Sequence, residues 1–261
     1  MMLQIDRKKA ERVFADYVEN YNSRDEKVRL KIEHTYRVAE LCERIAKSAG
    51  CPETEVDFAW LTGLLHDVGR FEQLKNFETF NDAQSIDHAA YGADILFREG
   101  RIRDYIEDCK KDELIENVVR YHNVYRLPEE FDNVTKKFCH ILRDADKVDI
   151  LKVNVDFPLQ EIYNVTTKEL REAAVSEAVM ESFKEEHATL RSLKKTAVDN
   201  VVGHISLIFE LVYPESLRIV KEQGYLEKLL SFETENQRTK EQFREVREIV
   251  ERYLENALQI M

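Results

Sequence analysis

Six side chains with metal-binding chemistry recur beside apolar stripes in the first part of the chain. They are His34, His66, Asp67, His88, His122 and Asp146. A buried polar group without a partner costs on the order of 1–3 kcal/mol, and an isolated buried charge costs much more. A shared metal ion would supply the partner, and imidazole with carboxylate donors suits Mn, Fe, Zn, Co or Ni. The sequence therefore predicts one metal site at which these six side chains meet.

Each of these residues also has a simpler interpretation. His34, His88 and His122 could be hydrogen-bonded core histidines. Asp67 could close a helix end, and the segment DADKVD around Asp146 could form a solvated acidic face. The occurrence of all six on five predicted helices, each beside an apolar stripe, favours the metal site over six separate structural roles.

Five predicted helices must position these side chains. Apolar residues at helical spacing predict helices over residues 26–49, from after Pro52 to before Gly69, from near residue 87, and over residues 112–125 and 135–151. His34 lies one turn before Val38, on the edge of the first apolar stripe. Because apolar stripes of neighbouring helices converge on one core, their flanking polar residues can converge too.

The composition points to an all-α fold. The 261 residues include only 7 glycines and 4 prolines, while 34% are Asp, Glu, Lys or Arg. Sandwiches, propellers and doubly wound sheets need many tight turns, which this composition does not supply. No Gly/Ser-rich or Pro-rich linker interrupts the chain, so we expect a single all-α domain over residues 1–261.

The charge balance and the cysteines limit the class of partner. With 39 basic against 51 acidic residues, the formal net charge is −12, which argues against binding to a nucleic acid polymer. No apolar run approaches the length of a membrane span, and the N-terminus lacks the apolar region of a signal peptide. The four cysteines form no C-x-x-C pair and are expected to be reduced thiols. We expect a cytoplasmic protein without membrane partners.

Residues 157–261 continue as helices. A buried helix is expected from Ala197 to Val212, ending before Pro214, and a charged one over residues 239–258. His187 and His204 are interpreted as structural. This helical extension is expected to pack on the metal-binding part and to shape substrate access, not to form a second catalytic domain.

Read together, the motifs around these ligands resemble a known family. IEHTYRVAELCERIA surrounds His34, WLTGLLHDVGRFEQ surrounds His66 and Asp67, IDHAAYGADIL contains His88, VVRYHN contains His122, and ILRDADKVDIL contains Asp146. This ordered set resembles the HD superfamily of metal-dependent phosphohydrolases, over a core of about residues 26–152.

The resemblance implies how the ligands divide. The first His, the His-Asp pair and the late Asp of the family hold one divalent ion, here through His34, His66, Asp67 and Asp146. Members with two further histidines hold a second ion bridged by the same aspartate, which implies His88 and His122 as its other ligands. One or two ions per chain are thus expected, with Mg added to the candidates named above. His122 is followed by Asn123, and no GYP motif is nearby, which argues against a cyclic dinucleotide substrate.

Two cations stand beside the predicted ligands. Arg70 follows His66 by one turn and is suited to bind phosphate as a bidentate fork, whereas Lys147 is next to Asp146 and would act as a point charge. Together with Asp67 they are the predicted catalytic residues, although either cation could instead be a surface charge. Asp94 and Asp144 could orient ligand histidines, with solvated helix faces as the alternative.

The leading hypothesis is a phosphohydrolase acting on a nucleotide or other small phosphorylated substrate. A metal neutralises phosphate oxygens and lowers the pKa of bound water toward 7. The alternatives are a two-metal phosphodiesterase, a mixed-ligand di-iron oxygenase-like enzyme of the same superfamily, and a non-catalytic metal-binding helical module. Substrate selectivity is expected to come from residues 71–82 and the C-terminal helices.

Overall fold

The computed structural model describes residues 4–163 and 165–259, which contain helices and no strand. The predicted all-α class is therefore confirmed. The chain divides into two compact units, Met1–Asp146 and Lys147–Met261. The single-domain organisation expected from the sequence stays a prediction, and the two units are described separately.

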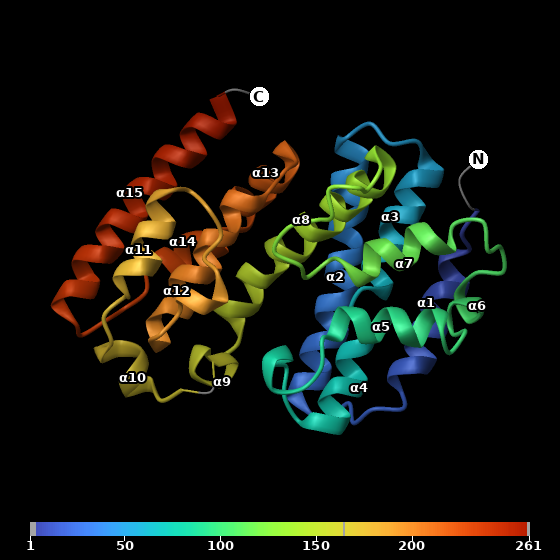
Figure 1. The fold of residues 1–261 in the computed structure, drawn as a ribbon, viewed down its shortest axis with the longest axis horizontal. Coiled ribbons are helices and arrows are strands. Elements are labelled where there is room, and N and C mark those ends of the chain that lie inside the picture. The colour runs from blue at the N-terminus through green and yellow to red at the C-terminus, as the bar shows by residue number, and fades with distance from the viewer. Residues whose placement is uncertain (1–3, 164, 260–261) are drawn as a thin grey trace. The chain divides into compact units, whose positions relative to one another are not determined.

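The first unit is a cluster of helices coloured blue to green in Figure 1. Its elements are α1 (Arg7–Val18), α2 (Glu26–Ser48), α3 (Glu53–Leu65), α4 (Val68–Phe77), the short 3-10 helix η1 (Asp82–Gln84), α5 (His88–Phe97), α6 (Ile102–Tyr105), α7 (Asp112–Arg120) and the first part of α8 (Asn133–Asp156).

Helices α2 and α3 approach each other to backbone contact. Asp25 caps α2 by accepting from the Lys27 backbone N–H, and the helix stops before Gly50, whose φ of +72° favours glycine. At Gly63 a Cβ atom would lie 2.7 Å from Ala39 Cα, so only glycine allows this approach. The close packing of α2 and α3 brings His34 and His66 to the same place.

The chain bends at the His66-Asp67 pair. Helix α3 ends at Leu65, and Asp67, with φ −105° and ψ 14°, separates it from α4. The next helix packs tightly on α5, because a Cβ at Gly69 would lie 2.2 Å from the His88 carbonyl oxygen and 2.6 Å from the Gly92 nitrogen. This contact sets the start of α5 against the bend that carries Asp67.

One predicted helix is shorter than expected. The helix predicted over residues 112–125 ends at Arg120, and the Tyr121 N–H closes it on the Asn117 carbonyl. His122 therefore lies in the turn after α7 and not on its apolar face, although it is buried. The stripe of Ile115, Val118 and Val119 ends where the helix does.

The second unit has a core of its own. It contains the end of α8, followed by α9 (Leu159–Tyr163), α10 (Thr167–Glu172), α11 (Glu177–Lys184), the 3-10 helix η2 (Arg191–Leu193), α12 (Ala197–Ile205), the 3-10 helix η3 (Ser206–Glu210), α13 (Pro214–Gln223), α14 (Tyr225–Leu230) and α15 (Gln237–Gln259). The helix expected from Ala197 to Val212 is thus α12 followed by a 3-10 turn. The buried Gln242 side chain ties α15 to the Val175 backbone N–H and carbonyl.

Among the described residues, no helix combines the length and the apolar character needed to cross a membrane. The cysteines are free thiols, with Cys42 and Cys139 buried.

Candidate metal centre

The six predicted ligands come together in the first unit. Two of the groups of side chains that could hold a metal ion there consist of predicted ligands alone, His34 with His66 and Asp67, and Asp67 with His88 and His122. The side chains of both groups are almost fully buried, with exposed fractions of 4% or less. Asp67 belongs to both groups, so the two are parts of one cluster.

The first group surrounds one carboxylate oxygen. Asp67 Oδ2 lies 3.5 Å from His34 Nε2 and 3.4 Å from His66 Nε2. The two Nε2 atoms are 3.3 Å apart. Asp146 Oδ1 lies 3.2 Å from His34 Nε2 and 3.9 Å from His66 Nε2, which completes a set of two imidazoles and two carboxylates.

The second group faces the other oxygen of the same aspartate. Asp67 Oδ1 lies 3.5 Å from His88 Nε2 and 4.0 Å from His122 Nε2, and these two nitrogens are 3.0 Å apart. One carboxylate therefore presents an oxygen to each pair of histidines.

The hydrogen bonds at Nδ1 decide what the Nε2 atoms can do. His66 Nδ1 lies 2.7 Å from the Gly63 carbonyl, and His122 Nδ1 lies 2.7 Å from the Val119 carbonyl. A carbonyl only accepts, so each Nδ1 carries the proton. Both carbonyls belong to the last turn of a helix, where backbone acceptors lack helical partners. The helix ends thereby fix the ring orientation, as outer hydrogen bonds do for metal-binding histidines.

His88 is oriented by a carboxylate instead. Its Nδ1 lies 2.8 Å from Asp82 Oδ2. Burial would raise the pKa of Asp82, but the hydrogen bond to His88 and the Arg70 charge outweigh it and lower that pKa. Asp82 is therefore an ionised acceptor, and His88 Nδ1 carries the proton.

The histidines of the second group are neutral with facing lone pairs. Burial and the neighbouring His88 and His66 lower the pKa of His122 to about 3, and burial with the Arg70 charge lowers the pKa of His88. With both protons on Nδ1, the two Nε2 lone pairs face each other at 3.0 Å with no hydrogen between them. A cation between them removes this repulsion, so the residues present fit a metal ion.

The carboxylates of the cluster are ionised. Burial would raise the pKa of Asp67, but the Lys31 ammonium and the His66 imidazole hold it well below its ordinary value. Burial acts in the same direction on Asp146, and the hydrogen bond to His34 lowers the pKa of this carboxyl. Ionised oxygens and neutral imidazoles are the forms that bind metal.

Arg70 lies beside the cluster, and its Nε–H has no hydrogen-bond partner among the described residues. Its Nη1 donates to Gln73 Oε1, to the Phe80 carbonyl and to Asp82 Oδ1, at 2.6–2.8 Å. Its buried Nε has no hydrogen-bond partner and lies 3.7 Å from Asp67 Oδ1. The other predicted cation, Lys147, follows Asp146 in α8 and is partly buried. Its catalytic role stays a prediction.

Two residues at the site were not singled out from the sequence. Lys31 Nζ lies 2.7 Å from Asp67 Oδ2, and its signal was its place one turn before His34. Asp82 orients His88 from a 3-10 turn, for which no periodic pattern exists. The buried Gln73 side chain joins Asp82 to a polar network, because its amide donates to Asp82, to Ser85 and to the Ile86 carbonyl.

Two interpretations of acidic residues need correction. Asp94 was predicted to orient a ligand histidine or to lie on a solvated helix face. Its carboxylate instead pairs with Arg120 at 2.7 Å and with Arg98 at 3.1 Å. The DADKVD segment is not a solvated face, because Asp144 and Asp149 are only 0% and 1% exposed. Both carboxylates are therefore inside the protein.

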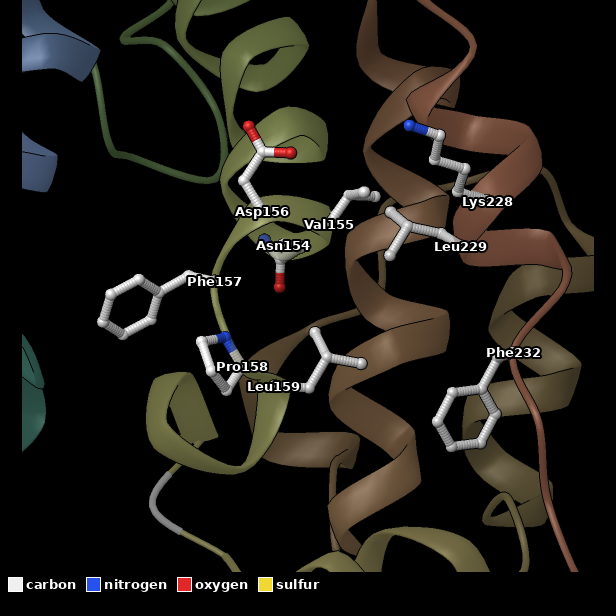
Figure 2. A pocket seen from close by; sticks show the side chains of 9 residues that line it. All are labelled: Asn154, Val155, Asp156, Phe157, Pro158, Leu159, Lys228, Leu229 and Phe232. Carbon is white, nitrogen blue, oxygen red and sulfur yellow. The ribbon is translucent and has the colours of Figure 1, made fainter.

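The second unit contains a pocket of about 390 Å³ (Figure 2). Figure 2 shows the apolar side chains of Val155, Leu159 and Leu229 gathered between the α8 and α14 segments. The Asn154 amide in its wall is engaged, since it donates to the Ile150 carbonyl and accepts from the Tyr163 hydroxyl. The other lining residues are Asp156, Phe157, Pro158, Lys228 and Phe232. None of the predicted metal ligands lines this pocket, and the expected role of this unit in substrate access stays a prediction.

Comparison with known proteins identifies a domain in the first part of the chain. Residues 32–151 match the family model of the HD domain, close to the core expected over residues 26–152. No curated protein and no solved structure matches the chain. The matched segment contains all six clustered side chains. The chain therefore contains an HD domain, which covers residues 32–151.

Proposed function

We propose that this protein is a metal-dependent phosphohydrolase that acts on a nucleotide or other small phosphate ester. The observation that supports this most is the position of Asp67, which presents one oxygen to His34 and His66 and the other to His88 and His122. Neutral imidazoles and an ionised carboxylate are the donors that a divalent transition metal prefers.

The ligands divide in the way that the family resemblance implies. His34, His66, Asp67 and Asp146 would hold the first ion, and Asp67, His88 and His122 would hold a second. When bound, such ions supply Lewis acidity toward phosphate oxygens and lower the pKa of water at the site.

The protein itself contributes oriented donors. The Arg70 guanidinium is held by three acceptors on Nη1, which leaves its Nε–H as a fixed donor beside Asp67. A fixed donor stabilises developing negative charge without reorganising during the reaction. In this proposal Arg70 contacts a phosphate oxygen through Nε, and Lys147 provides a further positive charge.

The first prediction tests the metal. Elemental analysis of freshly purified protein should find one or two transition-metal ions per chain, and Asp67→Ala should abolish tight binding because it removes the shared ligand. Asp94→Ala is the control, since that carboxylate pairs with arginines outside the cluster. Metal should also raise the Tm of the wild-type protein but not of Asp67→Ala. Unchanged stoichiometry and Tm in Asp67→Ala would refute the assignment.

Activity is tested on the same proteins. A panel of nucleotides and sugar phosphates with Mn, Co, Ni and Mg should reveal phosphate release by the wild-type protein and the Asp94→Ala control, and none by Asp67→Ala. A metal-loaded wild-type protein that releases phosphate from no member of the panel would contradict the proposed function.

A two-metal phosphodiesterase is the second candidate, favoured by the group around His88 and His122. Two ions can clamp the attacking and leaving oxygens of a phosphodiester. Comparing p-nitrophenyl phosphate with bis(p-nitrophenyl) phosphate separates the two candidates. A preference for the diester that disappears in His122→Ala would favour the phosphodiesterase.

A further inference from the structure

Lys31 lies at the edge of the buried cluster and contacts its central ligand. Its ammonium is 2.7 Å from Asp67 Oδ2, the oxygen that also faces His34 and His66. The Lys31 side chain is 18% exposed, whereas Asp67 is 2% exposed. Lys31 therefore connects the interior of the site with solvent.

The same lysine shares an aromatic neighbour with Arg70. The Lys31 ammonium lies 5.6 Å from the centre of the Phe80 ring, and the Arg70 guanidinium carbon lies 5.9 Å from it. The two cations also approach opposite oxygens of Asp67, because Arg70 Nε lies 3.7 Å from Oδ1. Two positive groups thus flank Asp67 beside one ring.

The Lys31–Asp67 ion pair competes with a metal for the same oxygen. An unpaired buried carboxylate is strongly unfavourable, so Lys31 neutralises Asp67 when no metal does. If His34, His66 and Asp67 held a metal ion, the Lys31 ammonium would no longer be needed to neutralise Asp67 and would be free to leave it. The flexible four-carbon stem then leaves a cation at the site edge, where an incoming anion can bind it.

We propose that Lys31 is a phosphate-binding cation of this centre alongside Arg70, held on Asp67 until a divalent metal takes that carboxylate, and that the substrate is a phosphate monoester. This inference rests on the proposed function and adds the class of substrate. Lys31 and the Arg70 Nε–H together favour the dianionic group of a monoester over the monoanionic group of a diester.

Binding measurements test the lysine separately from turnover. Manganese affinity and inorganic phosphate affinity are measured by calorimetry on the wild-type protein, Lys31→Met, Lys31→Arg and Arg29→Met. Arg29 is the matched control, an exposed cation on the same helix whose nearest acid is Glu26. Lys31→Met should bind manganese at least as tightly as the wild-type protein, because the competing ammonium is gone.

Phosphate affinity should change in the opposite direction. In manganese-loaded Lys31→Met, phosphate should bind about 10- to 100-fold more weakly, as expected for one lost charged hydrogen bond. Lys31→Arg should keep most of the affinity, and Arg29→Met all of it. Unchanged phosphate affinity in Lys31→Met would overturn the proposal. So would a parallel loss of manganese affinity, because Lys31 would then only support the ligands.

Kinetics on two substrates test the substrate class. Lys31→Met should raise KM for p-nitrophenyl phosphate more than for bis(p-nitrophenyl) phosphate, and an equal effect on both would overturn the monoester assignment. If the wild-type protein binds phosphate through Lys31 but hydrolyses neither ester, the proposed function fails while the Lys31 site stands. If the wild-type protein hydrolyses an ester and Lys31→Met hydrolyses it with the same kinetic constants, the Lys31 proposal fails while the proposed function stands.

Discussion

At the scale of single residues, the cluster is organised by hydrogen bonds that face away from it. His66 and His122 each donate to a carbonyl three residues earlier, and His88 donates to Asp82. These bonds place the lone pairs before any ion arrives. Removing the acceptor of one of these Nδ1–H bonds should therefore lower the metal affinity of one position without removing a ligand.

Asp82→Asn is the test of that idea. Because the variant loses the ionised acceptor of His88, the second metal position should bind about 10- to 100-fold more weakly, while the first keeps its affinity. Titration of the apoprotein with manganese measures both. Asp94→Asn serves as the control, and equal affinities in Asp82→Asn and the wild-type protein would show that His88 needs no such partner.

The convergence of these six side chains could be predicted from the sequence because each stands next to an apolar stripe. Asp82 could not be predicted, and the only signal for Lys31 was its place one turn before His34. A lysine one turn from His34 looks like any solvated helix residue until the position of Asp67 is known. Asp82 lies in a 3-10 turn, and its hydrogen bond to His88 depends on how α4 packs on α5.

At the scale of elements, glycine contacts set the spacing of the helices that carry the ligands. Gly69 touches the His88 carbonyl and Gly92, so α4 and the start of α5 meet backbone to backbone. No side chain can be placed there without moving His88.

Gly69→Ala should therefore be destabilising and should disturb metal binding. Overpacking of this kind costs about 1–3 kcal/mol in free energy of unfolding, and the displaced His88 should weaken the second metal position. Gly50→Ala is the control, since its φ is +72° but no atom lies within 4 Å of its Cβ position, so it should cost about 1 kcal/mol and leave metal binding intact. Urea unfolding and manganese titration measure the two effects. Intact manganese binding in Gly69→Ala would show that α5 can shift freely.

Helix positions followed from apolar spacing, but some helix ends did not. The predicted helix over residues 26–49 agrees with α2, where Asp25 and Gly50 provide clear start and stop signals. The helix predicted to residue 125 ends at Arg120, where His122 bonds to the Val119 carbonyl. This end could not be predicted, because no glycine or proline marks it in the sequence. The segment after the boundary is held by a tertiary contact, because Arg143 donates to the carbonyls of His122 and Val124.

At the scale of the whole molecule, stability should depend on a histidine far along the chain from the metal ligands. His204 Nδ1 lies 2.7 Å from the Tyr163 hydroxyl, which itself donates to Asn154, so His204 is the donor to Tyr163. Burial and the charges of Lys194 and Arg191 lower the pKa of His204 to about 3. The folded protein therefore holds this histidine neutral.

The pH dependence follows from that lowered pKa. The unfolded chain, with a histidine pKa of about 6.5, binds the proton first as the pH falls, so the contribution of His204 is present above about pH 6.5 and is lost progressively toward pH 3. Between pH 7 and 5 the wild-type protein should lose about 2 kcal/mol more free energy of unfolding than His204→Asn, which keeps a donor for Tyr163. Urea unfolding without added metal at both pH values measures the difference. Parallel losses would show that His204 titrates normally in the folded protein.

The contact between Gly69 and the start of α5 also bears on which ion fits. Because the backbone at Gly69 already touches the backbone at His88 and Gly92, the two segments cannot move closer together. We therefore expect the distance between Asp67 and His88 to vary little. Calcium takes six to eight oxygen ligands at about 2.3–2.6 Å, whereas zinc binds imidazole nitrogen at about 2.0–2.1 Å. We therefore expect this gap, which offers imidazole nitrogen beside the Asp67 carboxylate, to bind a small transition-metal ion more tightly than calcium.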